Sequence, residues 1–140
     1  ALELILKKSK KTMNKLIIDA VDKNIFFMII GNDYIYHISH ENSKINYEKI
    51  MILINEFLNS KNLAIKDISI LYVNRGPGSF AGIRNSLSTA KAIQLVKKID
   101  CYYYSFEDFK HDDKIKYENI PDLCNKFNVK KNLIKPIYLG

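Results

Sequence analysis

The chain contains few cysteines, few arginines and no long hydrophobic run. Its two cysteines, Cys101 and Cys124, lie far apart and form no C-x-x-C pair. That spacing argues against a disulfide scaffold or a zinc site and suits a reducing cytoplasm. No apolar stretch approaches the roughly 20 residues that cross a bilayer. Lysines follow the apolar start instead of preceding it, unlike in a secretory signal. The sequence therefore predicts a soluble, cytoplasmic protein with no membrane partner.

Arginine is scarce although the chain is basic. Twenty of the 22 basic residues are lysine, and the formal net charge is +7. Residues 1–15 carry five lysines and one glutamate, and so hold more than half of that charge. Phosphate and base recognition usually favours the fork of arginine. We therefore interpret residues 1–12 as a basic N-terminal extension, not as part of a dedicated nucleic-acid surface.

A chain of 140 residues suits one domain with a single core. Three short apolar runs are separated by turn-length gaps, which predicts a meander of antiparallel strands. After them the period becomes helical, then alternates between strand and helix. The predicted strands are residues 15–20, 24–31, 33–39, 67–73 and 100–105, and the predicted helices are 47–62 and 79–98. Shorter helices are expected at 106–109 and 121–127.

The resulting order, β-β-β-α-β-α-β, predicts a mixed five-stranded sheet in which right-handed crossovers return parallel strands. This is an α/β fold of the ribonuclease-H-like class, and also the order of one half of an actin-like ATPase. We assign residues 13–105 to this domain and residues 106–140 to a short C-terminal segment.

Residues 74–84, NRGPGSFAGIR, hold three of the five glycines and both arginines. They lack the lysine of a phosphate-binding P-loop and the pattern of a nucleophile elbow, and match a dinucleotide fingerprint only weakly. Two interpretations remain open. One is a strand-to-helix turn capped by a serine. The other is an anion site at the positive end of the helix. Its residues would be Arg75, Gly76, Gly78, Ser79 and Arg84.

The carboxylates do not complete a nuclease site. A ribonuclease-H-type centre needs carboxylates from the first strand, the first helix and the fourth strand to hold two metal ions. Asp19 ends the first strand, and Glu48 or Glu56 could serve from the helix, but the fourth strand ends in Asn74. We therefore predict no catalytic residue, no metal ligand and no cofactor.

Both main helices have more apolar surface than a helix that only covers a sheet requires. In the first, the apolar arc is widened by Tyr47, Met51 and Leu58. The second has a bulky side and a side of mostly small residues that would let another backbone approach closely. The surplus surface is either deep core or a contact face for a partner helix.

The segments LIIDAVD, residues 54–94 and the closing KPIYLG resemble the TsaB (YeaZ) family. The block from Gly76 to Lys91, with Arg84, Thr89 and Ala90 in place, is the most specific part. The resemblance covers about residues 15–105 and the last few. Two features depart from the family. Residues 106–135 stand where members have a second domain, and Ala20 and Val21 replace the usual Thr-Ser.

The resemblance implies a minimal, non-catalytic subunit of the bacterial complex that forms threonylcarbamoyladenosine at adenosine 37 of ANN-decoding tRNAs. Such a subunit binds the catalytic subunit TsaD by helix packing, the pair recruits TsaE, and contact with tRNA is indirect. It can form a homodimer when TsaD is absent. Under this interpretation the partner-binding residues are Tyr47, Met51, Leu58, Ile83, Leu87 and Lys91. The alternative is a small nucleotide- or anion-binding protein using the Gly-Pro-Gly-Ser turn.

Overall fold

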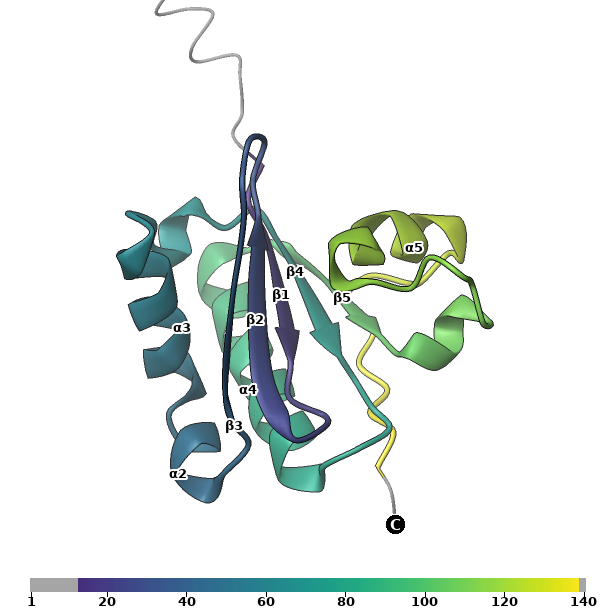
Figure 1. Ribbon diagram of the computed structural model, residues 1–140, viewed down its shortest axis with the longest axis horizontal. Helices are drawn as coiled ribbons and strands as arrows, with labels where there is room; N and C mark the ends of the chain where they lie inside the picture. The colour runs from purple at the N-terminus through teal and green to yellow at the C-terminus, as the bar shows by residue number, and fades with distance from the viewer. Residues whose placement is uncertain (1–12, 139–140) are drawn as a thin grey trace, which may run out of the picture.

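The computed structural model describes residues 13–138 and has three layers, with a sheet in the middle (Figure 1). The predicted extension, residues 1–12, lies outside the described residues. The strands are β1 (Lys15–Asp19), β2 (Asn24–Ile30), β3 (Ile35–Glu41), β4 (Ile70–Asn74) and β5 (Asp100–Tyr104). Their spatial order is β3-β2-β1-β4-β5. β1 pairs antiparallel with β2 and parallel with β4, and β4 pairs parallel with β5. The predicted order and the mixed sheet are confirmed.

The helices follow the prediction except around the first of them, and Asp67, the predicted start of the fourth strand, lies in a 3₁₀ turn. They are α2 (Lys44–Tyr47), α3 (Ile50–Ser60), α4 (Phe80–Lys97) and α5 (Ile120–Lys126), with short 3₁₀ turns η1 (Ile65–Asp67), η2 (Phe106–Phe109) and η3 (Tyr117–Asn119). The single helix predicted from Tyr47 is wrong at its start, because Lys49 has a non-helical backbone (φ −126°, ψ 30°) that separates α2 from α3. Within the described chain, no helix is both long enough and hydrophobic enough to span a bilayer.

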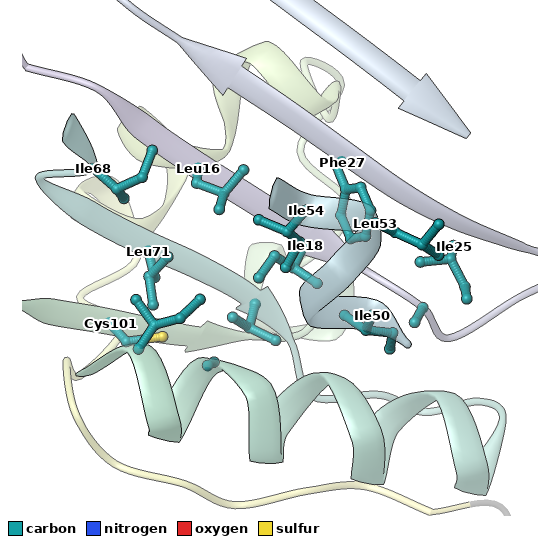
Figure 2. Packing of buried hydrophobic residues seen from close by; sticks show 14 of the residues in the cluster. Leu16, Ile18, Ile25, Phe27, Ile50, Leu53, Ile54, Ile68, Leu71 and Cys101 are labelled. Atoms are coloured by element: carbon teal, nitrogen blue, oxygen red, sulfur yellow. The ribbon is translucent and has the colours of Figure 1, made fainter. Parts of the chain in front are cut away.

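Alternate residues of the strands face two separate cores. On one face, Leu16, Ile18 and Leu71 pack with α3 and α4 (Figure 2). On the other face, Ile17 and Tyr72 pack with η2 and α5 from residues 106–127. Because both faces are covered, β1 and β4 are apolar at successive positions, as is typical of buried parallel strands. This confirms the prediction that the fourth strand is buried on both sides, and also the two short C-terminal helices.

Three of the residues predicted to bind a partner lie inside the chain's own core. Leu58 and Ile83 are 0% exposed and Leu87 is 6% exposed, all between the helices and the sheet. The wide apolar arcs therefore pack against the sheet and the neighbouring helix, and these side chains cannot reach a partner without unpacking the domain. Tyr47 and Met51 are half-buried and Lys91 is exposed.

The small-residue side of α4 also meets the chain's own backbone. A Cβ atom added at Gly82 would lie 1.9 Å from the carbonyl oxygen of Ala20, just past the end of β1. Ser86, on the same side, is fully buried. The close backbone approach anticipated for a partner helix is thus made by the segment that follows β1.

Residues 128–138 return beside β5 and α4 as an extended segment (Figure 1). The amide of Asn132 donates to the carbonyl of Cys101 (2.7 Å), and the amide of Ile137 donates to the carbonyl of Arg75 (2.7 Å). The last part of the chain is therefore attached to the edge of the sheet and to the Gly-Pro-Gly turn.

Candidate functional site

A buried polar cluster lies at the carboxyl ends of β1 and β4, the edge where open α/β sheets bind ligands. Its centre is Asp19, which is 3% exposed. One carboxylate oxygen accepts from the amide of Val21 (3.1 Å). The other accepts from Nδ2 of Asn74 (3.1 Å) and from the hydroxyl of Tyr117 (2.8 Å). With three donors, the buried carboxylate is satisfied within the chain, as buried charge requires.

Tyr117 is the member of this cluster that sequence reasoning missed. It comes from η3, 98 residues after Asp19, and stacks on Phe26 with a ring-centroid distance of 4.1 Å. Burial, and then the charge of Asp19, raise the pKa of the Tyr117 phenol well above its ordinary value, so the hydroxyl stays protonated and donates. No local pattern marks it, because only the packing of residues 106–127 brings it to β1.

Asn74 stands where a nuclease would place its third carboxylate. Its amide donates to Asp19, and its Oδ1 accepts from the amide of Gly76 (2.9 Å). Glu48 and Glu56 are exposed, so neither supplies a carboxylate to the buried cluster. Within residues 13–138, no three His, Cys, Asp or Glu side chains are grouped so that they could hold a metal ion.

The glycine-rich turn is used for packing. The Ser79 hydroxyl accepts from the amide of Gly82 (3.2 Å), which confirms the predicted N-cap. The Ser79 amide donates to the carbonyl of Val21 (2.8 Å), and Gly78 forms an isolated bridge with Tyr138. Gly76 has φ +112°, and a Cβ there would lie 2.1 Å from the carbonyl oxygen of Ile137. A glycine is required because the C-terminal segment passes directly against this backbone.

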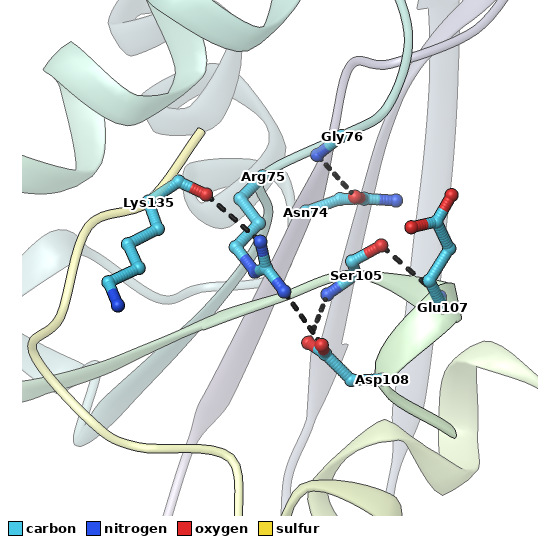
Figure 3. Close-up of polar contacts among 7 residues, drawn as sticks. All are labelled: Asn74, Arg75, Gly76, Ser105, Glu107, Asp108 and Lys135. Atoms are coloured by element: carbon cyan, nitrogen blue, oxygen red, sulfur yellow. Dashed lines mark hydrogen bonds and ion pairs between the residues drawn. The ribbon is translucent and has the colours of Figure 1, made fainter. Parts of the chain in front are cut away.

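Arg75, predicted to bind an anion, has its guanidinium bound within the chain (Figure 3). Nη2 pairs with Oδ1 of Asp108 at 2.6 Å, and Nη1 donates to the carbonyl of Lys135 at 3.0 Å. It therefore ties η2 and the C-terminal segment to the end of β4. Arg84 is exposed, with its guanidinium 5.9 Å from the ring centroid of Phe80. The two arginines have different partners and do not converge on one site.

A cavity of about 610 Å³ lies beside the turn. Two aspartates, Asp19 and Asp22, and three aromatic rings, Phe80, Phe106 and Tyr117, line it, and none of the described residues around it is lysine or arginine. The field inside is therefore negative. An anion would meet repulsion there despite the nearby N-terminus of α4, so the geometry opposes the predicted anion site.

Replacing Asp19 by asparagine should destabilise the fold by about 2 kcal/mol, because an amide NH₂ would face the donating Nδ2 of Asn74 and leave a buried donor unpaired. Urea unfolding followed by circular dichroism measures the change. Asp22→Asn, on the exposed side of the same cavity, is the matched control and should change stability by less than about 0.5 kcal/mol. Equal effects of the two substitutions would contradict the assignment of Asp19 as the centre of the cluster.

Comparison with known proteins gives sequence matches to part of the chain. The model of the family described as TsaD, tRNA N6-adenosine threonylcarbamoyltransferase, matches residues 40–104. A tRNA threonylcarbamoyladenosine biosynthesis protein TsaB from Buchnera aphidicola subsp. Baizongia pistaciae is 32% identical over 65 residues, covering 40% of this chain and 29% of the relative. A second TsaB, from Buchnera aphidicola subsp. Schizaphis graminum, is 32% identical over 68 residues, covering 49% and 32%.

The solved structure of YeaZ from Pseudomonas aeruginosa has the same fold, with a TM-score of 0.62 and 13% identity over 66% of this chain and 44% of that one. The chain matches less than a third of the length of the curated relatives. The partial sequence matches and the shared ribonuclease-H-like fold both support the TsaB/YeaZ family for this chain.

Proposed function

We propose that this chain is a non-catalytic subunit of the machinery that forms threonylcarbamoyladenosine in tRNA. In this role it binds the catalytic subunit TsaD as a scaffold and supports transfer to adenosine 37 of ANN-decoding tRNAs in the cytoplasm. The pair would recruit TsaE, and the isolated chain could pair with itself. The names of the curated relatives support the pathway, and the surface of the helical layer supports the scaffold role.

The observation that carries the proposal is a set of exposed aliphatic side chains on the helices. Ile45 on α2 is 72% exposed, Ile52 on α3 is 55% exposed and Val96 on α4 is 82% exposed. These helices contact one another on one face of the sheet. We propose that these side chains belong to one apolar surface, because a contiguous exposed apolar surface is typical of a protein-binding site. Together with half-buried Tyr47 and Met51, they replace the three core residues as the proposed contacts with TsaD.

The Asp19 cluster supports a non-catalytic role. Its carboxylate has three donors from the chain itself, and an amide stands at the end of β4. The Tyr117 hydroxyl donates to one of the two carboxylate oxygens, so that oxygen already has a partner within the chain. The alternative of a small nucleotide- or anion-binding protein has less support, because Asp19 and Asp22 give the adjoining cavity a negative charge.

Ile52→Glu should lower the affinity for TsaD at least about tenfold, because a charge placed in a desolvated contact is unpaired. Copurification of tagged TsaD with the full chain, followed by calorimetry, measures it. Ile35→Glu is the matched control: Ile35 is 51% exposed, nearly the same as Ile52, but lies on the edge strand β3. It should bind TsaD as the wild type does.

Two outcomes would count against the proposed surface. The first is wild-type binding by Ile52→Glu, and the second is an equal loss in both variants. Leu87→Glu is not a suitable probe, because Leu87 is a core residue and its charged replacement would unfold the domain. Circular dichroism of each variant separates loss of folding from loss of contact.

A further inference from the structure

We propose that two adjoining cavities beneath the C-terminal segment form a trough that binds single-stranded RNA. The first cavity, about 370 Å³, lies between η2, the end of α5 and residues 133–135. The second, about 520 Å³, lies between Tyr102 of β5 and residues 124–131. Both are lined by Asn128, Val129 and Lys130. We call this combined surface the lysine trough.

The charge of the lysine trough is positive. Its cationic lining residues are Arg75, Lys110, Lys130, Lys131 and Lys135, and its acidic ones are Glu107 and Asp108. Arg75 neutralises one of the two acidic residues, because it forms an ion pair with Asp108 (Figure 3). Nζ of Lys131 lies 3.3 Å from Oδ2 of Asp100. Both side chains are exposed, so this ion pair contributes little to stability.

Three lysines of the trough are left without an acidic partner. Lys110, Lys130 and Lys135 form no ion pair with any residue between 13 and 138 at the distances of a salt bridge. Within residues 126–138 there are four lysines and no acidic residue. A concave surface that holds several unpaired lysines attracts a polyanion.

The floor of the trough favours single-stranded nucleic acid over other polyanions. Phe127 lines the first cavity and Tyr102 lines the second, and both rings are half-buried. The amides of Asn125 and Asn128 line the same surface. A basic groove with aromatic rings is the arrangement by which proteins hold single-stranded nucleic acid, since bases stack on the rings while cations follow the backbone.

This inference deepens the proposed function and rests on it for the identity of the RNA, which would be a single-stranded segment of the tRNA being modified. The trough is lined mainly by residues 107–135, whereas Ile45 and Ile52 lie on helices that cover the opposite face of the sheet. RNA and TsaD could therefore be bound at the same time. Loss of one interaction can be measured without loss of the other.

The test compares two triple variants of the full chain that remove the same charge. Lys110→Gln/Lys130→Gln/Lys135→Gln changes the trough. Lys23→Gln/Lys44→Gln/Lys66→Gln changes three exposed lysines on other elements. The probe is a fluorescein-labelled single-stranded RNA of about 12 nucleotides, within the site sizes of such grooves, and fluorescence anisotropy is followed over a salt series. Both variants keep residues 1–12, so any contribution of those lysines cancels.

The trough variant should bind the RNA at least about tenfold more weakly than the wild type at low salt. The slope of log affinity against log salt should also be smaller in magnitude by about 2, because each of the three lost phosphate contacts to a single strand removes about 0.7. The control variant should keep both the affinity and the slope of the wild type. Equal losses in both variants would mean non-specific attraction, and equal affinity for a duplex of the same length would refute a single-strand site. Either result overturns the trough while leaving copurification with TsaD, and hence the proposed function, untouched. Conversely, RNA binding that persists without TsaD binding would support the trough and refute the proposed scaffold.

Discussion

Replacing Gly82 by alanine should destabilise the protein by about 3 kcal/mol, although alanine is the better helix former. In an exposed helix the exchange would stabilise by about 1 kcal/mol. Here the added Cβ would lie 1.9 Å from the carbonyl oxygen and 3.0 Å from the carbonyl carbon of Ala20. Both are backbone atoms at the end of β1, the central strand of the sheet, so the contact can be relieved only by moving α4 away from its core. Overpacking of this kind typically costs 1–3 kcal/mol and occasionally more.

Urea unfolding measures the loss, and Ser88→Ala on the exposed side of α4 is the matched control. Ser88→Ala should stabilise slightly, by up to about 0.5 kcal/mol, because only helix propensity changes. If Gly82→Ala were as stable as the wild type, α4 would not be held against β1 as described. The result would then reopen the possibility that the small-residue side of α4 faces a partner.

The stability of the protein should fall steeply above about pH 9. Burial raises the pKa of the Cys101 thiol, and also that of the Cys124 thiol, to about 12 from an ordinary value of 9.0. Each thiol therefore has a higher pKa in the folded state than in the unfolded state. The stability that this difference contributes is fully present below the unfolded-state pKa and is lost as the pH rises from that value through the folded-state pKa. At about pH 10.5, the free energy of unfolding should therefore be lower by about 2 kcal/mol for each of the two thiols. The buried phenols of Tyr72 and Tyr104, whose pKa values burial also raises, act in the same direction at higher pH.

Urea unfolding of the wild type and of Cys124→Ala between about pH 8 and about pH 10.5 tests this assignment. The substitution lowers stability at every pH, because it leaves a small cavity. The informative quantity is the decline with pH, which should be about 2 kcal/mol smaller in the variant. A decline of unchanged size would show that the Cys124 thiol does not carry the effect. Asp100 and Asp112, whose pKa values hydrogen bonds to Asn132 and Lys126 lower, are ionised throughout this range and do not contribute.

The order of strands and helices could be predicted because it depends on local properties. Alternation and apolar runs mark β1 to β5, the helical period marks α3 and α4, and a hydroxyl at Ser79 is a typical N-cap. Because crossovers between parallel strands are right-handed and neighbouring elements are usually adjacent in space, this order of elements leaves few possible topologies. Two assignments were wrong at their starts: α2 and α3 are separated at Lys49 within a stretch whose side chains suit a helix throughout, and the strand predicted from Asp67 begins only at Ile70.

What covers an apolar face could not be predicted in the same way. Periodicity shows that Leu58 and Leu87 lie on an apolar side, but not whether that side meets the chain's own sheet or another protein. The tertiary structure places them in the core and leaves Ile45 and Ile52 exposed. The same limit applies to Gly82, whose small size indicates a close backbone without identifying it as Ala20.

The amino-acid sequence by itself determined the fold class, the element order and the cap at Ser79, because each depends on residues close together in the chain. Only the tertiary structure decided the polar and charged contacts between residues far apart in the chain. Asp19 meets Tyr117 across 98 residues, Arg75 pairs with Asp108, and the lysines of the trough gather from η2, the end of α5 and the C-terminal segment. A polar side chain has no periodicity that shows its partner. Which group it contacts depends on where its charge lies in the folded protein, and that position is defined only once the cores on both faces of the sheet have packed.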